Sequence, residues 1–435
     1  MENLAHNHTI KHGNVLARYS PAQWLGVLIG IIMPVVSAMA YPTYMHSMQT
    51  PWVEWSRLLE APFVLCEIFV ILWASRKGMD SHQLWLSLPF DIKMASAVFV
   101  FGVFASSLLI SAHPLQSVTM SIITILHLLF ALSIYHLLRR SNIQDLTIFL
   151  MLLGNGLLVL AALTFWRFAF PPPASMVPGG VIEWGSALPG FISIRHFGSW
   201  TGAVATGFLV MLLFDEDKGR LPWVQAFYFL SASMTVWSGT RAAVLAMFIV
   251  TALSILVRRK MPSIPAITVT GLLTGTATTV ALLLPPYNHP DFQLFLWSDV
   301  ASANQFTSDR LELWAATFQK WQESVALGWG SGSIFWEVFV GWRHTQPHNA
   351  VLQFLISWGA VGTMAALWLL GRAITAVRIA TKRSASLLPL LAILYTLLLM
   401  SLLEGMLHYP RFIMLVMIMF AAILAHGNRQ ETSAS

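Results

Sequence analysis

The chain has 435 residues, of which 56% are hydrophobic and only 10% are charged. About a quarter of the residues in a typical soluble domain are charged, so this composition excludes a soluble globular protein and predicts a membrane protein. The sequence pI of about 9.6 does not indicate nucleic-acid binding, because the basic residues are spread over short loops between apolar runs. The single cysteine, Cys66, excludes an intrachain disulfide.

About twelve apolar runs are long enough to cross a bilayer, for which a helix needs about 20 residues. The runs are continuously apolar and do not alternate with a period of two, which favours helices over β-strands. We therefore predict an all-α polytopic membrane protein in which residues 1–435 form a single integral membrane domain. The runs lie at residues 22–41, 57–74, 92–112, 117–138, 146–166, 197–214, 221–238, 240–257, 263–285, 347–370, 386–403 and 408–426.

The distribution of Lys and Arg predicts the orientation in the membrane. If the runs alternate across the bilayer, most of the 25 basic residues fall on one side, together with both termini. Because cytoplasmic loops are enriched in Lys and Arg, this side is predicted to be cytoplasmic. All but one of the basic residues on the opposite, outer side are arginines. The outer basic residues are Arg57, Arg167, Arg195, Arg241, Arg310, Lys320, Arg343 and Arg411.

This preference for arginine on the outer side indicates an anion-binding site. Arginine binds phosphate through two parallel hydrogen bonds, whereas lysine would serve equally well as a signal for topology. The alternative is that these arginines reach the membrane surface or pair with outer carboxylates such as Glu183, Asp291 and Asp309.

A large outer loop, residues 286–346, lies between the ninth and tenth predicted helices. Ordered loops of this length are usually functional. Within it, the spacing of apolar residues predicts an amphipathic helix over residues 309–325. Its Trp-rich face is typical of a helix that lies in the membrane interface, with Arg310 at the edge of that face near lipid phosphates. The alternative is a helix packed on its own bundle. The apolar face contains Leu311, Trp314, Phe318, Trp321 and Val325.

The segment Arg343-His344-Thr345-Gln346-Pro347-His348 leads into the tenth helix. Proline suits a first helical turn, so Pro347 is predicted to begin the helix and His348 to lie at its outer end. The helix dipole disfavours an imidazolium there, which predicts a neutral His348 that can accept a proton. A histidine at a helix end is often structural, but the neighbouring Arg343 and the outer arginines favour a catalytic role.

Two further features of this segment bear on ligands. Asn349 and Gln353 are four residues apart, so on a helix their amides would share a face and contact a polar ligand. His344 and His348 have the spacing of a zinc pair. However, Pro347 interrupts the helix between them and no carboxylate completes a site, so we predict neither a metal nor another cofactor.

Three more outer arginines are candidates for the anion site. Arg241 follows the tight turn Ser238-Gly239-Thr240 at the start of a helix, where a cation opposes the helix dipole. Stability alone therefore does not explain its position. Arg195 lies at the mouth of the sixth helix. Arg411 lies on a short outer turn with Glu404, a carboxylate that could pair with an outer arginine.

Two blocks of the sequence resemble the O-antigen ligase and polymerase superfamily, and O-antigen ligases most of all. The turn Ser238-Gly239-Thr240-Arg241 is similar to its Ser-x-(Ser/Thr)-Arg element. The second block comprises Arg310-x-x-x-Trp314, Gly328-x-Gly330-x-Gly332, His348-Asn349-x-x-Leu352-Gln353 and Gly359-x-x-Gly362. The resemblance covers about residues 230–370 by motif, and the whole chain by helix number.

The resemblance implies a GT-C-like glycosyltransferase that acts without a metal on the periplasmic face of the bacterial inner membrane. The enzyme would transfer O-antigen from undecaprenyl pyrophosphate to a sugar hydroxyl of lipid A–core and so complete lipopolysaccharide. The family's essential loop histidine maps onto His348, and its two essential arginines map onto Arg241 and Arg310. Arg195 matches no motif and is added on its chemistry alone. Supporting roles are assigned to Asn349, Gln353, Arg343 and Arg411.

The chemistry of such a transfer fits these residues. A sugar diphosphate already has a good leaving group, so the reaction needs a base for the acceptor hydroxyl and cations for the diphosphate. We expect His348 to be the base and the arginines to be the cations, with inversion at the anomeric carbon.

Several alternatives stay open. An O-antigen polymerase or a protein O-oligosaccharyltransferase would use the same type of donor and differ in the acceptor. A lipid or glycan transporter is disfavoured, because few polar residues lie at the midplane and no internal repeat is found.

Overall fold

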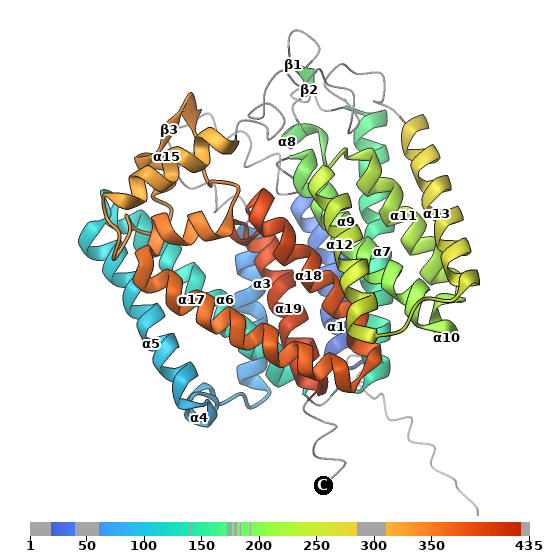
Figure 1. Cartoon of the computed structure of the whole chain (residues 1–435), viewed down its shortest axis with the longest axis horizontal. Coiled ribbons are helices and arrows are strands. Elements are labelled where there is room, and N and C mark those ends of the chain that lie inside the picture. The colour runs from blue at the N-terminus through green and yellow to red at the C-terminus, as the bar shows by residue number, and fades with distance from the viewer. Residues whose placement is uncertain are drawn as a thin grey trace, which may run out of the picture.

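The computed structural model describes residues 19–39, 61–139, 141–171, 176–177, 181–182, 184–191, 193–284 and 310–427. Over these residues the chain is a bundle of long helices that run alongside one another (Figure 1). The strands in this part of the chain form two short antiparallel hairpins. They are β1 (Met176–Val177) with β2 (Val181–Ile182), and β3 (Phe339–Val340) with β4 (Trp342–Arg343). The all-α prediction is confirmed.

Each predicted apolar run corresponds to a helix. Ten of the helices in the described residues are long and apolar enough to cross a membrane, so the chain is a multi-pass membrane protein. The runs at 57–74 and 221–238 correspond to α3 and α11, which have 16 residues each. The long helices are Pro21–Met39 (with α1, Pro21–Gly26, and η2, Val27–Ile32), α3 (Ala61–Arg76), α5 (Phe90–Ala105, continued by η4, Ser106–Ile110), α6 (Pro114–Leu138), α7 (Ile143–Ala169), α9 (Ile194–Phe214), α11 (Pro222–Trp237), α12 (Arg241–Arg258), α13 (Ile264–Leu283), α17 (Ala350–Arg383), α18 (Leu388–Glu404) and α19 (Pro410–Gly427).

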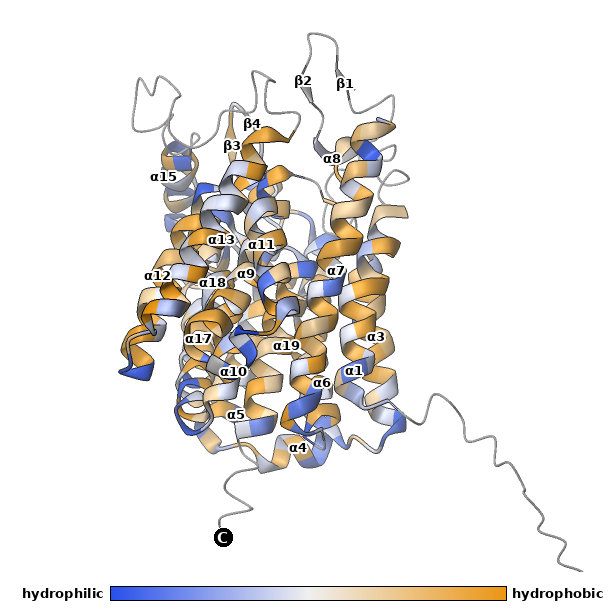
Figure 2. Ribbon diagram, turned by 90° about the vertical axis from the view of Figure 1, so that its right-hand side faces the viewer, coloured by the Kyte–Doolittle hydropathy of each residue, from blue (hydrophilic) through white to orange (hydrophobic). Residues whose placement is uncertain are grey.

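Short helices lie at the two ends of the bundle. The hydropathy colouring of Figure 2 shows apolar residues along the long helices and hydrophilic residues concentrated near their ends. The helices α8 and α15 and the two hairpins lie at one end, and α4 lies at the other (Figures 1 and 2). The short helices are α4 (Ser81–Ser87), α8 (Trp184–Ala187), α10 (Glu216–Gly219), α15 (Arg310–Gln322), α16 (Ile334–Glu337), η6 (Ala385–Leu387) and η7 (Met406–His408).

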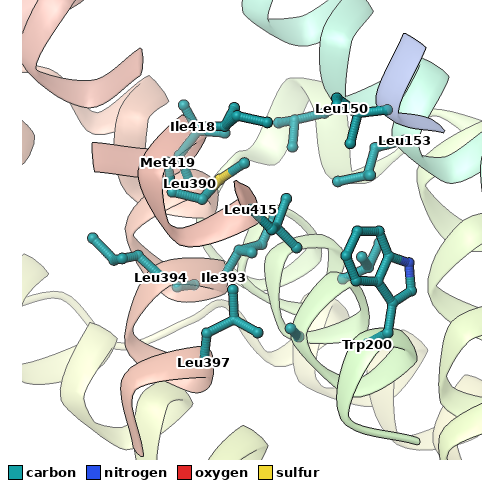
Figure 3. Packing of buried hydrophobic residues seen from close by; sticks show 14 of the residues in the cluster. Leu150, Leu153, Trp200, Leu390, Ile393, Leu394, Leu397, Leu415, Ile418 and Met419 are labelled. Atoms are coloured by element: carbon teal, nitrogen blue, oxygen red, sulfur yellow. The ribbon is translucent and has the colours of Figure 1, made fainter. Parts of the chain in front are cut away.

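The helices α9 and α19 form the centre of the bundle. In the apolar stretches of α9 and α19, 94% and 83% of the residues are buried. In α13 the share is 17%, so this helix lies at the periphery. Figure 3 shows leucine, isoleucine and methionine side chains of α18 and α19 packed beside Trp200 of α9 and Leu150 of α7. At Gly207 of α9, a Cβ atom would lie only 2.8 Å from the side chain of Ile393 of α18. This close packing holds the middle of α9 against α18.

The helix α17 is broken at Gly359, which has a φ of 61° and a ψ of −167°. Such a break frees backbone groups that must find other partners. Here the loop before α16 supplies them. Trp329 and Gly330 donate hydrogen bonds to the carbonyls of Ile356 and Ser357, at 2.8 and 3.0 Å, and the carbonyls of Val325 and Ala326 accept from Ala360 and Val361, at 2.7 and 3.1 Å.

Glycines of the motifs Gly328-x-Gly330-x-Gly332 and Gly359-x-x-Gly362 allow these hydrogen bonds between the loop and α17. A Cβ atom on Gly359 would lie 2.3 Å from the carbonyl oxygen of Ala326, and one on Gly328 would lie 2.6 Å from the nitrogen of Gly359. A Cβ atom on Gly330 would lie 2.4 Å from the hydroxyl of Ser117 in α6. Without side chains, Gly328 and Gly330 bring the loop backbone close to α17 and α6. Residues 325–330 of the large loop consequently pack on the helix that follows it.

Candidate functional site

Arg310, at the start of α15, points into the protein. Its Nη2 atom donates a hydrogen bond to Oε1 of Glu404 at 2.7 Å, and the two side chains are only 12% and 6% exposed. Glu404 is the last residue of α18. The expected position of Arg310 beside lipid phosphates is therefore wrong, because the guanidinium is buried against the carboxylate of Glu404.

The helix α15 begins at Arg310 and ends at Gln322, so it is shorter than predicted; Asp309 lies outside the described residues. The expected apolar face is divided. Leu311 and Phe318 are exposed, whereas the indole of Trp314 donates a hydrogen bond to the carbonyl of Pro347 at 2.8 Å. Arg310 and Trp314 lie one turn apart, so the Arg-x-x-x-Trp motif attaches α15 both to α18 and to the loop that carries His348.

His348 lies just before α17 and outside it. The helix begins at Ala350, and Asn349 is its N-cap, with a side-chain oxygen that accepts from the backbone of Val351 and Leu352 at 3.0 Å each. Asparagine is one of the best N-cap residues, and this outweighs the preference of proline for a first turn. The prediction that Pro347 begins the helix is therefore wrong. His348 instead has a φ of 55°, in the left-handed region.

Gln346 holds His348 from two sides. The backbone N–H of His348 donates to Oε1 of Gln346 at 3.1 Å, and Nε2 of Gln346 lies 3.0 Å from Nδ1 of the imidazole. Gln346 is 2% exposed. Gly405 makes room for it, because a Cβ atom on Gly405 would lie 1.6 Å from the side-chain oxygen of Gln346. The turn after α18 thus packs directly against the loop that carries Gln346 and His348.

The pKa of His348 is lowered from 6.5 to about 3, first by burial and then by the positive charge of Arg310, with smaller contributions from His196, Arg195 and His344. The imidazole is therefore neutral, as the sequence predicts. Burial and the neighbouring cations both disfavour the charged imidazolium.

Arg195 and Arg241 extend the positive charge around Arg310. Both are exposed, Arg195 in the first turn of α9 and Arg241 as the first residue of α12. Arg195 interacts electrostatically with Glu404, Arg310 and Arg241. Three arginines from three helices are therefore neighbours, and Arg310 and Arg195 both interact with Glu404. This excess of positive charge, next to a neutral histidine, suits an anionic ligand.

The turn before Arg241 is fixed by its own hydroxyl groups. The side chains of Ser238 and Thr240 lie 2.9 Å apart in a hydrogen bond, and both are buried. They contact α9 at Gly198, where a Cβ atom would lie about 2 Å from either hydroxyl. The serine and threonine of this motif thus position Arg241, and Gly198 allows α9 to approach closely enough for Arg195 to lie nearby.

The residues predicted to support the site have other partners in the structure. Asn349 also donates to the carbonyl of Leu402, at 3.1 Å, and buried Gln353 donates to the hydroxyl of Ser357 at 3.0 Å. Arg411 is 3% exposed; it donates to the carbonyl of Gly190 and lies 4.0 Å from the ring of Phe191. These contacts hold the loops and helix ends around the site. Arg343 belongs to β4, and its side chain lies outside the described part.

The sequence assigned no role to Gln346. It named Glu404 only as a carboxylate that could pair with an outer arginine, and the ion pair with Arg310 confirms that pairing. The signal for Glu404 was a carboxylate at the outer end of an apolar run, which is costly unless the carboxylate has a cationic partner. Gln346 carried no signal, since a glutamine two residues before a histidine has no defined spacing in a loop.

The comparisons with known proteins agree with the resemblance. Residues 226–369 match the model of the O-antigen ligase family. The chain carries an O-antigen ligase family domain. This domain spans about a third of the chain and contains Arg241, Arg310 and His348, whereas Arg195 and Glu404 lie outside it. The family is of the glycosyltransferase type and belongs to the ligase and polymerase superfamily. A comparison with curated proteins found no match.

Proposed function

We propose that the protein is an O-antigen ligase that transfers O-antigen from undecaprenyl pyrophosphate to a sugar hydroxyl of lipid A–core. The single observation that supports this best is the convergence of Arg195, Arg241 and Arg310 beside neutral His348. A diphosphate needs several cations, and an acceptor hydroxyl needs an uncharged polar group that can exchange a hydrogen bond with it. The ligase domain match supports the same reaction class.

In the proposed reaction, the bond between the anomeric carbon and the diphosphate oxygen breaks, and its electron pair stays on the diphosphate. The arginines stabilise this developing charge without a metal. The acceptor oxygen forms the new bond to the anomeric carbon and inverts it. Its proton leaves to a group in the site, for which the sequence predicts His348. The fold is proposed to be GT-C-like, with the site at the periplasmic face of the inner membrane and both termini in the cytoplasm.

Glu404 has a defined role in this proposal. Its carboxylate pairs with Arg310 at 2.7 Å and so neutralises one buried cation. A bound diphosphate would share Arg310 with Glu404 and engage Arg195 and Arg241. The site is thus organised before the substrate binds, which reduces the cost of ordering it.

Reconstitution tests the proposal. The purified protein in liposomes is supplied with undecaprenyl-pyrophosphate-linked O-antigen and lipid A–core, and the product is followed on a gel. We expect the lipid A–core band to shift to higher mass, with EDTA present or absent. Longer lipid-linked chains without modified lipid A–core would indicate a polymerase, and transfer to a serine or threonine peptide would indicate a protein glycosyltransferase. Loss of activity in EDTA would contradict a metal-free reaction.

A further inference from the structure

The contacts of Gln346 determine which nitrogen of His348 carries a proton. The backbone N–H of His348 can only donate, so the atom of Gln346 that faces it at 3.1 Å is the amide oxygen. Rotating the amide by half a turn would place two donors against each other. The amide nitrogen of Gln346 therefore faces Nδ1 of the imidazole at 3.0 Å.

An amide nitrogen has only hydrogens to offer, so Nδ1 of His348 must accept this hydrogen bond. In a neutral imidazole, one nitrogen accepts and the other carries the hydrogen. The hydrogen is consequently on Nε2. Nε2 makes no hydrogen bond to another part of the described chain, which leaves it for a substrate.

We propose that Gln346 is a positioning residue that locks His348 in the Nε2–H tautomer, so that the imidazole meets the substrate as a hydrogen-bond donor. This inference rests on the proposed glycan transfer and defines the role of His348 within it. The partner that the surroundings favour is an oxygen of the donor diphosphate, because Arg310 and Arg195 lie close to the imidazole. His348 then stabilises the charge that develops on the diphosphate, together with the arginines.

This assignment replaces the base role that the sequence predicts for His348, so the proton of the acceptor hydroxyl goes to another group. In this tautomer Nε2 cannot accept a proton, and Nδ1 is occupied by Gln346. When the anomeric carbon leaves the diphosphate, the electron pair remains on a diphosphate oxygen. The proton of the acceptor hydroxyl passes to that diphosphate as the new glycosidic bond forms, so no protein base is required.

The residues around Gln346 hold its side chain in place against His348. Gln346 is buried and hydrogen-bonded at both ends of its amide, and Gly405 leaves space for it. Trp314 donates to the carbonyl of Pro347, between the two residues of the lock. A side chain held in this way loses little additional entropy when the substrate binds.

The substitution Gln346→Glu tests the lock with almost no change in shape. A carboxylate still accepts from the backbone N–H of His348, but its second oxygen needs a hydrogen from Nδ1. The tautomer therefore reverses, and Nε2 becomes a free base. A donor role predicts that transfer falls by about 10²-fold or more, whereas a base role at Nε2 predicts retained or increased transfer. Gln322→Glu, an exposed change in α15, is the matched control.

The tautomer itself is measured by ¹⁵N NMR of histidine-labelled protein in nanodiscs, with His348 assigned from a His348→Gln spectrum. We expect a protonated Nε2 in the wild type and a protonated Nδ1 in Gln346→Glu. A protonated Nδ1 in the wild type, an unchanged tautomer in the variant, or full transfer by the variant would each overturn the proposal. Because the spectra need no substrate, they remain decisive even if the protein does not transfer O-antigen to lipid A–core.

Discussion

Arg310 and Glu404 lie 94 positions apart in the sequence and are joined by a buried ion pair of 2.7 Å. The pair connects the start of α15 to the end of α18, and the loop with His348 lies between them. Breaking a buried pair by removing one partner costs about 3–5 kcal/mol, because the other charge is left uncompensated. The same arginine is the buried cation of the proposed diphosphate site, so in this proposal it supports both the fold and the reaction.

Substitutions at this pair should separate the two roles. We expect Arg310→Ala to abolish transfer and to lower the melting temperature, since it removes a cation and leaves Glu404 unpaired. Glu404→Gln keeps a hydrogen-bond acceptor and the charge of Arg310, so it should retain α15 in place with a smaller loss of stability. Thermal unfolding and initial rates would be measured for both. Equal melting temperatures for the wild type and Arg310→Ala would show that the pair does not support the fold.

Arg241 offers a test that is free of this complication, because it is exposed. Arg241→Ala should leave the melting temperature nearly unchanged and reduce transfer by about 10²-fold, as expected for the loss of one charge-assisted contact in the transition state. Arg241→Lys should recover only part of the rate, because an ammonium group cannot bind two oxygens in parallel. Arg258→Ala, at the far end of α12, is the control. Wild-type rates for Arg241→Ala would remove this residue from the site.

Much of the fold follows from the sequence, because continuous apolar runs leave a helix as the only local structure that satisfies the backbone in a bilayer. The family motifs likewise predicted Arg241, Arg310 and His348. The sequence did not predict which way the side chain of Arg310 points. Whether Arg310 turns toward lipid or toward Glu404 depends on where α18 ends relative to α15, and that is a tertiary property.

The start of α17 shows a second limit. Proline at a first turn and asparagine at an N-cap are both sound local rules, and they compete within three residues at Pro347 and Asn349. The structure follows the N-cap, since the side chain of Asn349 bonds two backbone groups. Because α17 begins after Asn349, His348 lies outside the helix and can contact Gln346. No local rule predicts this contact.

The orientation in the membrane is testable at two opposite ends of the bundle. The helices α15 and α4 lie at these ends (Figures 1 and 2), and Gln322 of α15 and His82 of α4 are both exposed. In a Cys66→Ala background, Gln322→Cys should react with an impermeant maleimide on intact spheroplasts, and His82→Cys should react only after permeabilisation. The reverse pattern would place the arginine site in the cytoplasm and exclude the proposed periplasmic reaction.

Gly359 should be intolerant of any side chain. Its φ of 61° disfavours other residues, and a Cβ atom would lie 2.3 Å from the carbonyl oxygen of Ala326. Gly359→Ala should therefore lower the free energy of unfolding by about 1–3 kcal/mol and weaken the contact between the loop and α17. Hydrogen exchange at Ala360 and Val361, which bond to that loop, would report the loosening. Gly371→Ala is the control, because that helical glycine has open space around it. Similar exchange in both variants would contradict the role of the break.

The protonation of His348 should make the stability of the protein depend on pH. Burial and Arg310 lower the pKa of its imidazole to about 3 in the folded protein, against 6.5 as the ordinary value. Between these values the unfolded chain binds a proton that the folded protein does not, so His348 makes the folded state less stable as pH falls from 6.5 toward 3. Above 6.5 it has no such effect, because the imidazole is neutral in both states.

The variant His348→Gln removes this titration while keeping a polar side chain of similar length. The melting temperature of the wild type should therefore fall more steeply than that of the variant between pH 6.5 and about 4, and the two slopes should agree above pH 7. Transfer by the wild type should show no decline from protonation of His348 between about pH 5 and 8. A rate that halves near pH 6.5, together with equal stability slopes, would show that His348 titrates normally and is not buried beside Arg310.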